Sequence, residues 1–137
     1  MNKLFTLLML WMLSCLPSLA QAPMDGGVWK DNTGKHINAH GGNIFNYKGT
    51  YYWYGESRSA DGKPYSSLGV SCFTSKDLKK WTNHGLVLPV TDEPGSDIEG
   101  GCIIERPKVL YNQKTKKFVM WFHLELKGRG YGAARYG

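Results

Sequence analysis

The sequence predicts an all-β fold that is built from repeated strand–turn–strand units. Residues 43–47 and 51–54 are rich in strand-forming side chains, and Lys48-Gly49 between them is typical of a hairpin turn. A similar unit follows further along the chain, in residues 104–111 and 118–123, with polar residues 112–117 between its two strands. The repetition of such units indicates a β-propeller or a related array.

The two units can be aligned over their first strands, 65 residues apart, so that Ile44 corresponds to Val109. In this alignment His40 corresponds to Glu105, and each lies at the start of a strand. Pro107 lacks a backbone N–H and therefore favours an edge strand, and the innermost strand of a propeller blade is such an edge. Glu105 is accordingly expected at the mouth of the central channel.

The residues between the two units complete a first blade of four antiparallel strands. Residues 69–74 and 86–90 predict its third and fourth strands. In the turn between them, Asp77 is expected to accept hydrogen bonds from backbone amides, and Trp81 is expected to pack back under the strands. One full blade thus fits residues 40–90.

The second blade is incomplete in this sequence. Its first two strands are followed by a third that is expected to begin near Tyr131, and the sequence ends at Gly137. Propellers typically close from four to eight blades. We therefore interpret residues 23–137 as the incomplete N-terminal part of a propeller domain, either in a longer protein or in a truncated reading frame.

Residues 1–22 predict a secretory signal peptide rather than part of the fold. A short basic start is followed by the apolar run 4–13 and by Ala20-Gln21-Ala22, which has the form of a cleavage site. The run is too short to span a bilayer. The protein is expected to be secreted or periplasmic, with lipid anchoring at Cys15 as the alternative.

Charge and composition limit the partners that the chain is expected to bind. The net charge of the whole sequence is +6, and it becomes +5 without residues 1–22, because these contain Lys3 and no acid. The basic residues are spread over loops and form no run of five like charges, which favours a solvated surface over a nucleic-acid interface. The sequence does not define the oligomeric state.

No cofactor is predicted from the sequence, and two features leave alternatives open. Cys72 and Cys102 remain after cleavage, and they could form a disulfide or act as small buried apolar side chains. Their spacing does not suggest zinc. The acidic residues 91–101 leave a structural calcium ion conceivable, although their spacing matches no standard ligand pattern.

Two polar positions near the first hairpin have a structural and a functional interpretation. His40 is followed by Gly41-Gly42, which suits either the floor of a site or a β-bulge where the strand enters the sheet. Glu56 ends the aromatic strand, where it is either a ligand-binding carboxylate or an ordinary solvated side chain.

Four segments of the sequence are distinctive, namely AHGGNIFNYKGTYYWYGE, GVSCFTSKDLKKW, IERPKVLYN and FVMWFH. Together they resemble glycoside hydrolase family 43, and within it the branch that includes exo-β-1,3-galactanases. The resemblance covers about residues 28–137. It implies a five-bladed β-propeller, of which the first blade and part of the second are present.

The resemblance also implies roles for particular residues. Family members hydrolyse glycosidic bonds with inversion, which requires an acid on the leaving oxygen and a base on water. Glu105 matches the carboxylate that tunes the pKa of the acid and orients the sugar, and Glu56, His40 and Tyr131 are candidate sugar-binding residues. The usual first-blade Asp base is absent here, as in the galactanase branch, and the general acid is expected beyond Gly137.

The expected function is therefore hydrolysis of β-1,3-linked galactan in plant polysaccharides, with an oligo- or polysaccharide as the partner. The segment present here is expected to be inactive by itself. One alternative is a non-catalytic sugar-binding propeller, which the missing Asp would suit. The other is a family 43 arabinofuranosidase or xylosidase.

Overall fold

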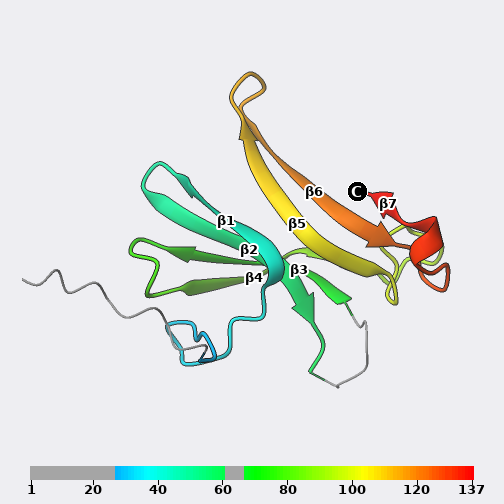
Figure 1. Cartoon of the computed structure of the whole chain (residues 1–137), viewed down its shortest axis with the longest axis horizontal. Helices are drawn as coiled ribbons and strands as arrows, with labels where there is room; N and C mark the ends of the chain where they lie inside the picture. Colours follow the sequence, from blue (N-terminus) through cyan, green and yellow to red (C-terminus); the bar gives the residue numbers. More distant parts are fainter. Residues whose placement is uncertain (1–26, 61–66) are drawn as a thin grey trace, which may run out of the picture.

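The computed structural model describes residues 27–60 and 67–137, and within them the chain forms two antiparallel β-sheets (Figure 1). The first sheet contains β1 (His40–Tyr47), β2 (Thr50–Arg58), β3 (Ser67–Ser75) and β4 (Thr82–Pro89), in that order. The second contains β5 (Ile103–Asn112), β6 (Lys117–Glu125) and β7 (Arg135–Tyr136), with the 3₁₀ turn η1 (Tyr131–Ala133) between the last two strands.

The hairpin that joins β1 to β2 is confirmed. Both turn residues have positive φ, 50° at Lys48 and 76° at Gly49, as a two-residue turn between twisted strands requires. Asn46 supports the turn because its side-chain oxygen accepts a hydrogen bond from the Gly49 amide at 3.2 Å. The turn sets the register in which Ile44 lies opposite Trp53.

Two predicted elements differ from the structure. The fourth strand begins at Thr82, four residues before the predicted start, because Thr82 and Asn83 pair with β3 while lying exposed at the sheet edge. The residues at Tyr131 form η1 instead of a strand, and β7 begins only at Arg135. Gly128 and Gly130 precede the turn with φ of 66°, a left-handed conformation that interrupts an extended chain.

Two clusters of buried side chains form the core. The first lies against the four-stranded sheet and consists of Ile37, Ala39, Phe73 and Trp81, so the prediction that Trp81 packs under the strands is confirmed. The second joins the two sheets, because Val70 of β3 packs with Cys102, Ile104 and Leu124. Each large apolar side chain buried in this way contributes about 1.5–3 kcal/mol relative to exposure.

The edge strands β1 and β5 hold the two sheets together by polar contacts. The Asn43 side chain donates to the Val109 carbonyl at 3.2 Å and accepts from the Val109 amide at 3.0 Å, as a neighbouring strand would. Lys108 Nζ donates to the carbonyls of Gly41 at 3.0 Å and Gly42 at 2.7 Å. β5 is the edge strand that Pro107 predicted.

The two described cysteines are buried and unbonded, so the disulfide alternative is wrong and the interpretation as buried apolar side chains is confirmed. Burial raises the pKa of both thiols, Cys72 and Cys102, which keeps them protonated. The predicted signal peptide, Cys15 and the loop residues 61–66 lie outside the described residues. No helix within the described ranges is long and apolar enough to cross a membrane.

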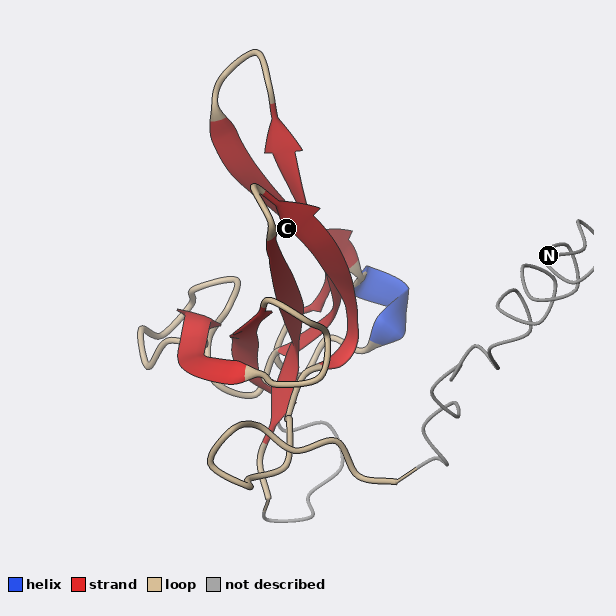
Figure 2. Cartoon of the chain, turned by 90° about the vertical axis from the view of Figure 1, so that its left-hand side faces the viewer, coloured by secondary structure: helices blue, strands red, loops and turns tan. Residues whose placement is uncertain are grey.

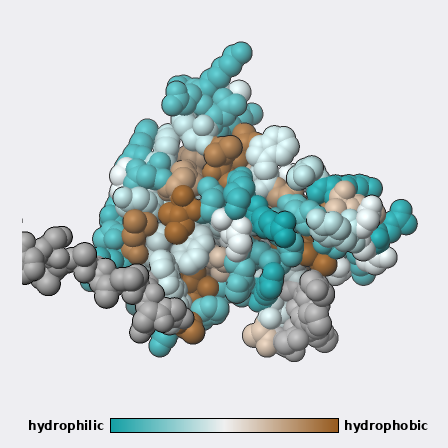
Figure 3. Space-filling view, in the orientation of Figure 1, coloured by the Kyte–Doolittle hydropathy of each residue, from teal (hydrophilic) through white to brown (hydrophobic). Residues whose placement is uncertain are grey.

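Viewed from the side, the second sheet rises away from the first, and η1 lies beyond the end of β6 (Figure 2, blue). Figure 3 shows the molecule in the orientation of Figure 1, and this face carries several apolar residues among the polar ones. The packing of the two sheets brings the start of β1, the end of β2 and the start of β5 close together. The polar side chains at these strand ends form the candidate site.

Candidate functional site

The site is built from strand ends that the two sheets bring together. His40 opens β1 and lies opposite Glu56 near the end of β2, because the two strands run antiparallel. Arg58 is the last residue of β2, and its guanidinium connects two acids. Its Nη2 lies 2.8 Å from Glu56 Oε2 and 3.9 Å from Glu105 Oε1. A site that sequence analysis divided between two units is therefore continuous in space.

Glu56 is buried, with only 4% of its side chain exposed. The alternative of a solvated surface carboxylate is therefore wrong. A buried carboxylate is costly unless it is paired and hydrogen-bonded, and the short contact to Arg58 supplies that partner. Sequence analysis missed this burial because it depends on the pairing of Glu56 with Val70 in the neighbouring strand β3.

Glu105 lies between two cations at the inner edge of the second sheet. Its carboxylate is 19% exposed, with Arg58 Nη2 at 3.9 Å and Arg106 Nη2 also at 3.9 Å. A β-bulge between Glu105 and Lys108, with Arg106 at φ 52°, changes the direction of the strand here. Bulges commonly redirect side chains next to active sites, and this one leaves Glu105 partly accessible.

At His40-Gly41-Gly42 the structure confirms the β-bulge, and the interpretation as the floor of a site stays a prediction. The register shifts between His40 and Asn43, so a bulge is present. The backbone also approaches closely, because a Cβ on Gly42 would lie 1.6 Å from the Tyr54 carbonyl oxygen. Burial, together with the nearby Arg58 charge, lowers the pKa of His40, so its imidazole is held towards the neutral form.

Tyr131 lies in η1, with 69% of the residue exposed. Its ring stacks on His123, with centroids 5.3 Å apart and planes inclined by 29°. Both rings line an open cavity of about 230 Å³ together with Arg106 and Trp121. Tyr131 thus contacts His123, which lies opposite Glu105 in the pair β5–β6. Glu56 is connected to Glu105 through Arg58, and His40 lies opposite Glu56.

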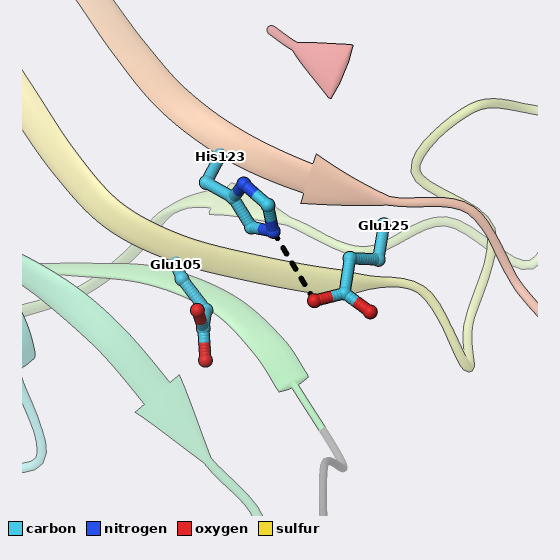
Figure 4. Close-up of side chains that lie close together, drawn as sticks. All are labelled: Glu105, His123 and Glu125. Carbon is cyan, nitrogen blue, oxygen red and sulfur yellow. Dashed lines mark hydrogen bonds and ion pairs between the residues drawn. The ribbon is translucent and has the colours of Figure 1, made fainter. Parts of the chain in front are cut away.

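Sequence analysis missed two residues of β6, His123 and Glu125. His123 lies opposite Glu105 in the register of β5 and β6, and its Nε2 is 3.1 Å from Glu125 Oε1. Figure 4 shows these side chains with that contact. The alternating pattern His-x-Glu, which places both side chains on one face of a strand, was the available signal.

Glu105, His123 and Glu125 are also the group of described residues that could hold a metal ion, since their potential ligand atoms lie within 4.8 Å of one another. The acidic segment 91–101 forms no such group within the described residues. Two of its acids are instead engaged with cations, Glu99 with Lys127 at 2.6 Å and Asp97 with Arg135 at 3.2 Å.

Comparison with known proteins identifies relatives of this chain. Solved structures that resemble it include a GH43 β-1,3-galactosidase with galactodeoxynojirimycin, at 54% sequence identity and a TM-score of 0.73, over 81% of this chain and 32% of that protein. An exo-β-1,3-galactanase from Clostridium thermocellum matches at 43% identity and a TM-score of 0.67, over 82% and 24%. An exo-β-1,3-galactanase from Phanerochaete chrysosporium, solved with galactose, matches at 36% identity and a TM-score of 0.70, over 81% and 25%.

The chain spans about a third or less of the length of these proteins. No family model and no curated protein matches the sequence. The two antiparallel sheets are a partial match to the GH43 propeller proteins. The identity of 35–54% over about four fifths of the chain shows that it is related to the GH43 β-1,3-galactosidases and exo-β-1,3-galactanases.

Proposed function

We propose that the protein to which this chain contributes hydrolyses β-1,3-linked galactan, releasing galactose with inversion. The observation that carries the proposal is the 54% identity to a β-1,3-galactosidase over 81% of the chain. A galactanase relative was also solved with β-1,3-galactotriose, which supports a carbohydrate ligand. We further propose that the two sheets correspond to the first blade and part of the second blade of a five-bladed propeller.

Glu105 is the residue to which we assign the pKa-tuning and sugar-orienting role. A negative charge close to a catalytic acid raises the pKa of that acid and keeps it protonated for its task. The 19% exposure of Glu105 leaves the carboxylate able to meet a ligand, and the guanidinium groups of Arg58 and Arg106 balance its charge. The general acid itself is proposed to come from outside the matched segment.

The other candidate residues take different parts. Glu56 is too deeply buried for broad contact with a sugar, so its main part is to hold Arg58 beside Glu105. His40, held towards neutrality, has a ring nitrogen that can donate to or accept from a sugar hydroxyl. Tyr131 offers an exposed ring face and a hydroxyl.

The test is made on the full-length protein from its native source. Its intact mass is measured first, and an N-terminus at Pro23 would support cleavage of residues 1–22 and export. Galactose release from β-1,3-galactan is then followed, beside release of arabinose or xylose from their own substrates. Release of galactose supports the proposal, and preference for an arabinoside or xyloside overturns the substrate assignment.

Within that assay, Glu105→Gln is predicted to lower turnover at least about a hundredfold, because loss of a group that assists proton transfer costs 10²–10⁴-fold. The matched control is Glu93→Gln, which removes an exposed acid on the loop before β5 and is predicted to leave turnover unchanged. Unchanged turnover in the Glu105 variant would exclude its assigned role.

A non-catalytic sugar-binding protein is the second candidate. The observation in its favour is that the strand entry His40-Gly41-Gly42 carries no Asp, the residue that the family generally uses as its base. Calorimetric binding of galacto-oligosaccharides by the same full-length protein, without any release of galactose, would establish this candidate in place of the hydrolase.

A further inference from the structure

The strand β6 places a histidine directly beside the proposed site. His123 is the residue opposite Glu105 in the antiparallel pair formed by β5 and β6. Side chains of directly opposed residues emerge on the same face of a sheet. The imidazole therefore lies on the face that carries the Glu105 carboxylate, and both groups come from rigid strands.

Two contacts fix the orientation of the His123 ring. Its Nε2 lies 3.1 Å from Glu125 Oε1, and each of these side chains is 13% exposed. Residues 123 and 125 are two apart on one strand, so they share a face and the contact follows from strand geometry. The flat side of the ring stacks against Tyr131 at 5.3 Å between centroids.

The orientation of the Tyr131 ring depends on this stack more than the orientation of a strand residue would. It lies in a turn of three residues that has no buried member and follows Gly130, whose φ is 66°. The turn is closed by the hydrogen bonds from Ala133 N to Gly130 O and from Ala134 N to Tyr131 O. These contacts fix the backbone, and among the described aromatic rings His123 is the one that stacks on the Tyr131 ring.

A metal ion is the competing use for Glu105, His123 and Glu125, and the surrounding charges disfavour it. His123 Nε2 and Glu125 Oε1 already contact each other, so an ion would have to break this pair. Arg58 and Arg106 stand 3.9 Å from Glu105, where their positive charges repel a cation. In Figure 4 the dashed contact joins His123 to Glu125, and none of the drawn contacts reaches Glu105.

We propose that His123 is a positioning residue of the sugar-binding site. Glu125 fixes the imidazole, and the imidazole holds the Tyr131 ring at the cavity that both rings line, so that the ring is ordered before a sugar arrives. Ordering a contact group in advance removes part of the entropic cost of binding. The inference rests on the proposed function, because it requires that Tyr131 contacts the sugar.

The test is a double-mutant cycle in the full-length protein, with KM and kcat measured on β-1,3-galacto-oligosaccharides. Stacked aromatic pairs change equilibria by about two- to tenfold, so His123→Ala is expected to raise KM by about that factor and to alter kcat less. The double variant with Tyr131→Ala is expected to be no worse than Tyr131→Ala alone. A structural effect of His123 would instead multiply with the effect of Tyr131.

Two further variants guard against loss of folding. His123→Phe keeps a flat ring against Tyr131, and its KM is expected to stay close to that of the wild type. Glu125→Ala frees the imidazole, and its KM is expected to rise. Equal KM in His123→Ala and wild type, or multiplicative effects in the cycle, would overturn the positioning role. Wild-type protein that releases no galactose would overturn the proposed function, and the positioning role with it.

The stack is also measured without any reference to activity. In aromatic NMR spectra of the same protein, the ring protons of His123 are expected to shift when Tyr131→Leu removes the ring current of the neighbouring phenol. Unshifted His123 resonances would show that the two rings are not stacked in solution and would overturn the inference even in an active enzyme.

Discussion

At Glu56 an ion pair with Arg58 compensates for the burial of a charge. The carboxylate is 4% exposed and Arg58, half exposed, lies 2.8 Å away. Removing one partner of such a pair leaves a buried charge uncompensated, which costs far more than loss of a surface salt bridge. The stability of this strand end and the charge beside Glu105 therefore depend on the same guanidinium.

Arg58→Ala is predicted to lower the free energy of unfolding by about 1–3 kcal/mol, a value reduced from that of a fully buried pair because Arg58 is half exposed. Chemical denaturation of the purified protein measures it. The matched control is Arg135→Ala, which removes an exposed pair with Asp97 and is predicted to cost at most about 1 kcal/mol. Equal losses in the two variants would show that Glu56 does not need its partner.

At the scale of elements, the turn between β3 and β4 is held by one carboxylate, as the sequence predicted. Asp77 Oδ1 accepts from the backbone amides of Lys80 at 2.8 Å and Lys79 at 2.9 Å. These hydrogen bonds favour the ionised form and lower the pKa of Asp77 below its ordinary value of 3.8. The stabilisation is present above that value and is lost as the pH falls through the lower pKa of the folded state.

Asp77→Asn is consequently predicted to lower the melting temperature near neutral pH, while the difference from wild type shrinks as the pH falls below 3.8. Thermal unfolding followed by circular dichroism over a pH series measures this effect. Asp92→Asn, on an exposed loop position, serves as the control and is expected to match wild type throughout. A difference that stays constant with pH would rule out the charge of Asp77 as its cause.

The sequence patterns predicted the elements whose signals lie within a few residues. They missed the features that depend on which strands pair with each other. The hairpin at Lys48-Gly49 and the edge strand at Pro107 each follow from backbone chemistry within a few residues. The burial of Glu56 and the place of His123 beside Glu105 depend on which strands pair, and this is decided by residues far along the chain. The strand predicted near Tyr131 is wrong because Gly128 and Gly130, both with φ of 66°, interrupt the extended chain just before it.

At the scale of the whole molecule, the second sheet carries large apolar side chains that the described residues do not cover. They are Leu110, Trp121 and Tyr136, exposed by 60%, 56% and 85%. Soluble proteins rarely leave large apolar patches open, and such patches generally mark an interaction surface. The relatives extend well beyond the matched segment, which supports the proposal that a longer protein covers this sheet.

Residues 23–137 produced alone are therefore predicted to self-associate and to bind the dye ANS, since the sheet β5–β7 stays uncovered. Sedimentation at increasing concentration measures the association, and the double variant Leu110→Lys, Trp121→Lys is expected to reduce it, because two charges then lie on the apolar face. Val28→Lys, which changes a side chain that is 65% exposed outside both sheets, is the matched control and is expected to associate as the unaltered segment does. A segment that stays monomeric and binds no dye would contradict an uncovered interaction surface, and would count against the proposal that further blades pack on this sheet.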